Sequence, residues 1–173
     1  MNDVRALIRD VPDFPKPGIV FKDITPVLAD ARAFTRVIDA LRERYVGRAD
    51  MVVGIESRGF ILGAPLAYAL GVGLGVIRKP GKLPWEKISA AYALEYGSDT
   101  LEMHRDAIAR RSRIVLVDDL LATGGTAAAA LGLIHQAGGT VIESAFMVEL
   151  SFLAGRQKLS PTEVFSLVRY EEE

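Results

Sequence analysis

Short runs rich in Val, Ile and Leu alternate with segments of helical character, and this alternation constrains the fold more than any other feature. The runs are residues 51–55 (MVVGI), 74–77 (LGVI), 113–117 (RIVLV), 140–148 (TVIESAFMV) and 164–168 (VFSLV). Near-continuous apolar strands are typical of parallel sheets that are buried on both faces. Intervening helices supply the crossover connections. The sequence therefore predicts an α/β fold with a mainly parallel, twisted sheet flanked by helices.

The segments between these runs predict the remaining elements. Helices are expected at residues 4–9, 32–45, 59–71 and about 125–136. Residues 12–26 contain four prolines, so we expect a loop with a short extended piece at residues 19–22. A polar excursion before the third run has a strand-like piece at residues 89–95. We find no linker, and 173 residues fit one domain.

Composition excludes several function classes. The net charge is −1 and no run of Lys or Arg exceeds two residues, which disfavours a nucleic acid or an anionic membrane as partner. With no cysteine there is no disulfide and no thiolate chemistry. The uncharged stretch 60–77 approaches the length of a membrane span, but Pro65 and three glycines favour a helix, a turn and a strand. No signal-like segment begins the chain, so a cytoplasmic location is expected.

The segment 118–126, DDLLATGGT, combines chemistries that suit a sugar phosphate. A helix that begins near Gly125 offers free amide groups and a positive dipole end to a phosphate, and Thr123 and Thr126 add hydroxyl donors. Asp118 and Asp119 would repel a phosphate but suit hydroxyl groups or a hydrated cation. A sugar with a 5-phosphate and free 2- and 3-hydroxyls satisfies both halves. The alternative is an ordinary strand–turn–helix corner.

Two further loops follow predicted strands and should meet DDLLATGGT at one sheet edge, because ligands of parallel sheets bind beyond the carboxyl ends of the strands. In ESRG, residues 56–59, Arg58 could hold an anion at a helix start, although Ser57 could also be a plain helix cap. In RKPGKLP, residues 78–84, Arg78, Lys79 and Lys82 supply cations, unless this is a solvated basic loop. No GxxxxGK[ST] motif is present, which argues against a P-loop NTPase.

These segments resemble a known family. VDDLLATGGT is similar to the signature of the type I phosphoribosyltransferases, which bind 5-phosphoribosyl 1-pyrophosphate. FPKPGIVFKDITP, ESRGF, IRKPGKLPWE, YALEYG and MVELSFLAGRQKL resemble the adenine branch of that family, in order and at similar spacing over about residues 10–170. The resemblance implies one type I phosphoribosyltransferase domain over residues 1–173, with a small N-terminal hood at about 1–30 and a mobile lid at about 80–105.

The resemblance also implies a reaction and partners. The family converts adenine and phosphoribosyl pyrophosphate into AMP and pyrophosphate with Mg²⁺, in purine salvage. The metal is held through the substrate, and no protein ligand is assigned to it. A homodimer is expected.

Site residues follow from the resemblance by position. Ribose hydroxyls would bind to Asp118 and Asp119, and the 5-phosphate to Ala122, Thr123, Gly124, Gly125 and Thr126. Pyrophosphate would meet Glu56, Ser57 and Arg58, where the family often has a non-proline cis peptide, and Arg78 and Lys82, partly across a dimer interface. Adenine would meet the backbone of Val20, the ring of Phe21, and Lys22, where many relatives have arginine. On the lid, Glu95 would bond the purine N7 and assist proton transfer, accompanied by Tyr96.

Two alternatives remain open at this point. A 6-oxo purine as substrate would call for a lysine soon after the signature, and residues 140–150 contain none. A regulator that senses the sugar phosphate on the same fold would require a basic face or an added DNA-binding segment.

Overall fold

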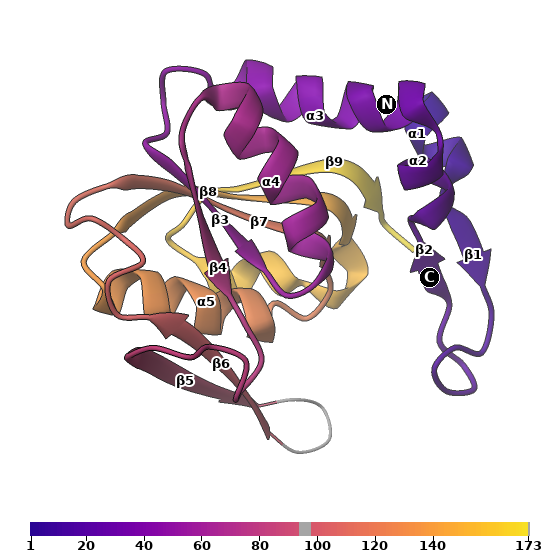
Figure 1. Ribbon diagram of the computed structural model, residues 1–173. Coiled ribbons are helices and arrows are strands. Elements are labelled where there is room, and N and C mark those ends of the chain that lie inside the picture. The colour runs from indigo at the N-terminus through magenta and orange to yellow at the C-terminus, as the bar shows by residue number, and fades with distance from the viewer. Residues whose placement is uncertain (94–97, 173) are drawn as a thin grey trace.

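A computed structural model describes residues 1–93 and 98–172 of the chain. Its centre is a five-stranded sheet in the order β4-β3-β7-β8-β9 (Figure 1). These strands are β3 (Met51–Ile55), β4 (Gly73–Ile77), β7 (Arg113–Leu121), β8 (Thr140–Leu150) and β9 (Val164–Tyr170). Every neighbouring pair is parallel, so the predicted α/β fold with a parallel sheet is confirmed.

Helices cover both faces of the sheet, as its apolar strands require. On one face α3 (Ala31–Tyr45) and α4 (Arg58–Leu70) share a buried cluster with Val52, Val115 and Met147. On the other face α5 (Gly125–Gln136) packs against a cluster that contains Val53 and Leu116. Successive residues of one strand thus enter opposite cores, which is the consequence of the two-residue period of a strand.

The uncharged stretch 60–77 divides as predicted into helix, turn and strand. Helix α4 ends at Leu70, Gly71 adopts a left-handed conformation with φ +69°, and β4 follows. Pro65 is accommodated inside the helix. Among residues 1–93 and 98–172, no helix is long and apolar enough to cross a membrane.

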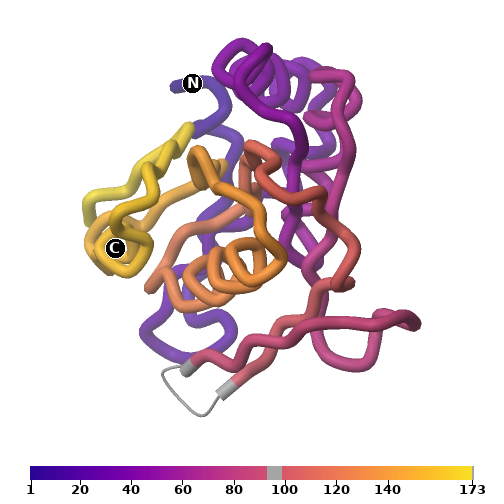
Figure 2. Tube along the Cα trace, turned by 90° about the vertical axis from the view of Figure 1, so that its left-hand side faces the viewer, coloured from indigo at the N-terminus to yellow at the C-terminus, as the bar shows by residue number. Residues whose placement is uncertain are grey.

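The first thirty residues form a separate layer beside the sheet. Here α1 (Asn2–Leu7) and α2 (Thr25–Ala29) accompany an antiparallel pair, β1 (Arg9–Val11) and β2 (Phe21–Asp23). Both views place this layer next to the C-terminal strand β9 (Figures 1 and 2). An Arg5 guanidinium nitrogen donates to the carbonyl oxygen of Arg169 at 3.0 Å, which ties the two ends of the chain together.

A two-stranded hairpin projects below the sheet in Figure 1. It consists of β5 (Lys87–Ala93) and β6 (Ser98–His104), paired in an antiparallel register from Lys87–His104 to Ala93–Ser98. Glu95 and Tyr96 lie outside the described residues, and the mobile lid stays a prediction.

Several sequence-based boundaries were wrong. β7 extends to Leu121 because its pairing with β8 continues from Asp118–Phe146 to Leu121–Glu149, so the acidic pair lies inside the strand and not after it. The N-terminal helix ends at Leu7, and β1 begins at Arg9. Helix α2, strand β6 and two 3-10 turns, η1 (Ser151–Leu153) and η2 (Gly155–Leu159), were not predicted. Their patterns are too short or too polar to show a period.

Candidate active site

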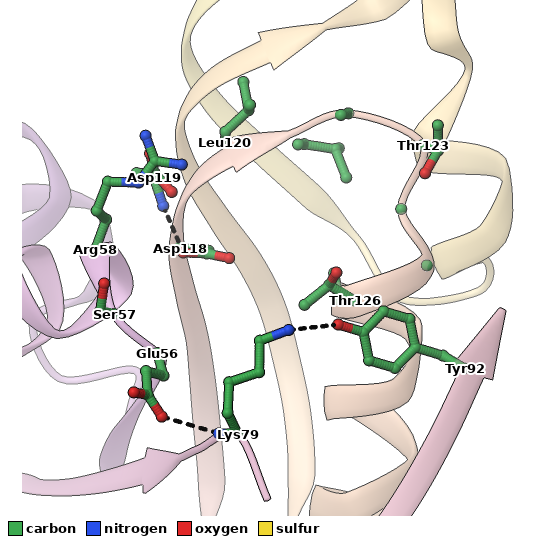
Figure 3. A pocket seen from close by; sticks show the side chains of 15 residues that line it. Glu56, Ser57, Arg58, Lys79, Tyr92, Asp118, Asp119, Leu120, Thr123 and Thr126 are labelled. Atoms are coloured by element: carbon green, nitrogen blue, oxygen red, sulfur yellow. Dashed lines mark hydrogen bonds and ion pairs between the residues drawn. The ribbon is translucent and has the colours of Figure 1, made fainter. Parts of the chain in front are cut away.

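The loops that follow β3 and β4 meet the end of β7 at the carboxyl edge of the sheet, as predicted. Between them lies a cavity of about 360 Å³, within the range of small-molecule sites (Figure 3). It is lined by Glu56, Ser57, Arg58, Lys79, Tyr92, Asp118, Asp119, Leu120, Leu121, Ala122, Thr123, Gly124, Gly125, Thr126 and Ala127. The structure therefore brings the acidic pair, the small-residue loop and the ESRG loop to one place.

The two carboxylates of β7 have different partners. Asp119 is buried and its Oδ2 lies 3.0 Å from Nη1 of Arg58, whereas Asp118 accepts a hydrogen bond from the Asp119 amide at 2.9 Å. Burial, together with the neighbouring Asp119 charge, raises the pKa of Asp118 well above its usual value. Burial also raises the pKa of Asp119, although Arg58 opposes this. Hydroxyl donors or a cation would relieve the repulsion within the pair.

The loop after β7 leads directly into a helix start. Gly124 precedes α5 in the left-handed conformation, with φ +80°, which favours glycine. The first turn of α5 has no acidic residue, so its free amides and dipole are available to an anion. This geometry suits a phosphate at residues 122–126.

The carboxylate of Glu56 organises the cations of the neighbouring loop. It accepts hydrogen bonds from Lys82 Nζ at 2.6 Å, the Lys79 amide at 2.9 Å and Arg78 Nε at 3.3 Å. Burial alone would raise the pKa of Glu56, but these partners lower it to about 2. Arg78 and Lys82 thus sit on Glu56 and do not line the described cavity. The Glu56–Ser57 peptide is cis, as the resemblance implied, and in the described chain the Ser57 side chain makes no capping hydrogen bond.

Five residues outside the predicted set line the cavity, and two of them, Lys79 and Tyr92, have polar side chains. Lys79 points into it and contacts the hydroxyl of Tyr92 at 3.3 Å (Figure 3). Lys79 also forms an ion pair with the carboxylate of Asp99. Burial alone would lower the pKa of Lys79, but the contacts with Asp99 and Tyr92 outweigh burial and raise the pKa above its usual value. The side chain therefore stays cationic. The RKPGKLP segment was the available signal for Lys79, but a loop sequence does not show which of its three cations turns inward. Tyr92 carried no such signal.

The N-terminal layer brings Phe21 toward the site but turns Lys22 elsewhere. The Arg58 guanidinium carbon lies 5.3 Å from the ring centroid of Phe21, so Phe21 adjoins the residue that holds Asp119. Lys22 is buried, donates to Asp10 at 2.9 Å and lies 4.4 Å from the Tyr170 ring centroid. Adjacent strand residues face opposite sides, so the Lys22 side chain does not lie with Phe21. The contacts of Val20, Phe21 and Lys22 with adenine stay predictions.

The fold and this site define a phosphoribosyl transferase domain. The family model of that description matches residues 22–168. An adenine phosphoribosyltransferase from Roseiflexus sp. (strain RS-1) is 60% identical over 170 residues, which cover 98% of this chain and 99% of the relative. The chain belongs to the adenine phosphoribosyltransferase family.

Solved structures agree with this family. The crystal structure of adenine phosphoribosyltransferase from Thermoanaerobacter pseudethanolicus is 51% identical, with a TM-score of 0.95 and coverage of 98% of this chain and 99% of that one. The enzyme from Saccharomyces cerevisiae, crystallised with D-2,5-dideoxy-2,5-imino-altritol 1,6-bisphosphate and adenine, is 42% identical with a TM-score of 0.92. The two chains are covered to 96% and 97%.

Proposed function

We propose that the cavity at the end of β7 is where this chain carries out the reaction of its family. That reaction transfers the 5-phosphoribosyl group from phosphoribosyl pyrophosphate to adenine and yields AMP and pyrophosphate. The observation that carries the assignment is the juxtaposition, in one cavity, of the Asp118–Asp119 pair, the α5 start and the Lys79 cation. A sugar with hydroxyls, a 5-phosphate and an anionic leaving group has a complement for each of these parts.

The ribose 5-phosphate half is assigned to the end of β7. The amides and hydroxyls of residues 122–126 would bind the 5-phosphate, while Asp118 and Asp119 accept hydrogen bonds from the ribose hydroxyls. Arg58 neutralises Asp119 from the opposite side and keeps its carboxylate oriented. The neighbouring carboxylates of Asp118 and Asp119 repel each other when no ligand is bound. Ribose hydroxyls would donate hydrogen bonds to these buried groups more effectively than water does.

The pyrophosphate half is assigned to the opposite wall, where Lys79, Ser57 and Arg58 line the cavity. Glu56 stays ionised and holds the loop through Arg78 and Lys82, so the carboxylate would support the cations without touching the anion. Arg78 and Lys82 would reach pyrophosphate only after leaving Glu56 or from a partner subunit.

Mg²⁺ fits the site as a companion of the substrate. In the described part of the chain, no group of three or more His, Cys, Asp or Glu could hold a metal. Mg²⁺ commonly uses one or two carboxylates with substrate phosphates, and Asp118 and Asp119 are the carboxylates beside the ribose position. When bound it neutralises the charge that develops on the leaving pyrophosphate.

The bonds that break and form at C1 of the ribose explain the roles proposed for the lid, Glu95 and Phe21. The bond from C1 to the pyrophosphate oxygen breaks, the other imidazole-ring nitrogen of adenine bonds to C1 through its lone pair, and the proton on N7 passes to the carboxylate of Glu95. The positive charge at C1 requires exclusion of water, which the family assigns to the lid. Glu95 would bond the purine N7 and assist the proton transfer, and Phe21 would pack on the ring, held from its other side by Arg58.

A panel of bases tests this function. The protein is incubated with phosphoribosyl pyrophosphate, Mg²⁺ and adenine, hypoxanthine, guanine or xanthine in turn, and nucleotide and pyrophosphate are measured. We expect AMP from adenine and no nucleotide from the others. A product from a 6-oxo base would overturn the adenine assignment, and tight sugar-phosphate binding without any product would favour a regulator.

We also propose a homodimer formed by the exposed side of α4 and the edge strand β4. Ile61 and Tyr68, seven residues apart on one helix face, are exposed, and Tyr68 is 91% accessible. Leu74 and Trp85 are exposed as well, with Trp85 at 67%. In this proposal the four side chains together form the apolar contact surface between the two subunits. Light scattering should give twice the monomer mass, and Tyr68→Glu should shift it toward the monomer; a monomeric wild type would refute the proposal.

A further inference from the structure

The backbone of Gly155 lies directly against the loop assigned to the 5-phosphate. A Cβ atom built on Gly155 would be 2.1 Å from the Ala122 carbonyl oxygen and 3.1 Å from the Gly124 nitrogen. A Cβ on Gly124 would in turn be 2.5 Å from the Gly155 carbonyl oxygen. Neither position has room for a side chain. Residues 122–124 therefore rest on a second piece of backbone, about thirty residues further along the chain.

Arg156, the next residue, is tied to β8 and to its neighbour β9, the edge strand on that side of the sheet. Its Nε and Nη2 donate to the two carboxylate oxygens of Glu149 at 2.5 and 2.7 Å, and its Nη1 donates to the Val164 carbonyl at 2.7 Å. Glu149 is 2% exposed and pairs in register with Leu121, the last residue of β7. The ion pair thus connects the end of β7, through β8, to the segment that carries Gly155.

From these contacts we propose that the Glu149–Arg156 pair is a clamp that positions the phosphate-binding loop through Gly155. The proposal rests on the assignment of the 5-phosphate to residues 122–126. Backbone donors bind an anion well only when they are held within a fraction of an ångström of the productive geometry. Arg156 and Gly155 are positioning residues in this scheme, because they act through Ala122 and Gly124 and touch no substrate.

Separate titrations with the two halves of the substrate distinguish a positioning effect from a general loss of structure. Arg156→Ala, Arg156→Lys, Glu149→Gln and Gly155→Ala are titrated in the full-length protein with ribose 5-phosphate and, separately, with inorganic pyrophosphate. We expect Arg156→Ala to weaken ribose 5-phosphate by about ten-fold, which is about 1.4 kcal/mol, and to change pyrophosphate affinity by less than about two-fold. Arg156→Lys should restore part of the loss, since lysine keeps the charge but not the bidentate geometry. Glu149→Gln preserves shape and carries the test if Arg156→Ala does not fold.

The chain offers a matched control on the same strand. Arg44 makes an equivalent bidentate pair with buried Glu143 of β8, at 2.5 and 2.6 Å, but far along the strand from the phosphate loop. Arg44→Ala should lower the free energy of unfolding without changing the affinity for ribose 5-phosphate.

The outcomes are distinct. If Arg156→Ala leaves ribose 5-phosphate affinity unchanged, or weakens both ligands equally, the clamp is refuted and the pair is only structural. A wild-type protein that binds ribose 5-phosphate but forms no AMP would refute the proposed function and leave the clamp measurable. A wild-type protein that does not bind ribose 5-phosphate would overturn both.

Discussion

Gly59→Ala should damage the protein at the contact between α4 and β7. Gly59 is the second residue of α4, and a Cβ there would lie 2.6 Å from the Val117 carbonyl oxygen and 3.1 Å from Oδ1 of Asp118. Ordinary contacts begin near 3.4 Å, so helix or strand must move by roughly half an ångström or more, against a backbone atom. Overpacking of this kind costs about 1–3 kcal/mol. The shift also displaces Asp118, so we expect the KM for phosphoribosyl pyrophosphate to rise by about ten-fold.

Two other glycines supply controls for this substitution. A Cβ on Gly63, in the same helix, would lie 3.4 Å from the end of the flexible Leu74 side chain, and one on Gly132 in α5 would meet nothing within 4 Å. Alanine at Gly132 should stabilise by about 0.5–1 kcal/mol, because glycine is a poor helix former.

Urea unfolding and steady-state kinetics measure both effects, and each kcal/mol should move the Tm by about 2–4 °C in a chain of this length. If Gly59→Ala matches wild type in stability and in KM, the close approach of α4 to β7 does not constrain the site.

Three further results are expected. Asp119→Asn should weaken phosphoribosyl pyrophosphate binding by about 10- to 100-fold in titration calorimetry, because a charged hydrogen bond to ribose is lost; equal affinity would remove Asp119 from the hydroxyl site. Glu95→Gln should lower kcat by about 10²- to 10⁴-fold with little change in substrate binding, and unaltered turnover would exclude it from proton transfer. Burial alone would raise the pKa of Glu143, but hydrogen bonds from Arg44 and Tyr45 lower it below 4.5. Its stabilisation is therefore present above pH 4.5 and lost as the pH falls through the folded-state pKa. Glu143→Gln should cost about 2–3 kcal/mol at pH 7, below the full cost for a buried pair because Arg44 is partly exposed. This difference should shrink in urea titrations below pH 4.5, and a constant difference would contradict the assignment.

The position of Lys22 shows how structure refines a residue-by-residue resemblance. The resemblance implied that Lys22 meets adenine, at a position where it leads one to expect arginine. In the fold it is buried between Asp10 and Tyr170, where it joins the N-terminal layer to β9. A stem with a compact ammonium group fits that enclosed position without the planar fork of arginine. The sequence did not reveal this because Tyr170 is remote from Lys22 in the chain, and Asp10 lies on the other strand of the β1–β2 pair.

Local patterns in the sequence determined the fold class and predicted which loops line the cavity. Runs such as MVVGI and RIVLV require burial on both faces, and a small-residue loop between a strand and a helix presents amides wherever it occurs. Both signals depend on neighbours within a few residues, so they could be interpreted without coordinates. The sequence also predicted that the ESRG, RKPGKLP and DDLLATGGT loops meet at one sheet edge, because the carboxyl ends of parallel strands all lie on the same side.

Tertiary structure alone decided which side chains enter the cavity and what holds them. Lys79 points inward while Arg78 and Lys82 turn to Glu56, because the carboxylate of a different loop captures them. β7 continues through the acidic pair because β8 lies beside it, and the backbone of residues 122–124 is supported by Gly155. Each of these depends on contacts between residues far apart in the chain, where energies of packing and ion pairing outweigh local preference.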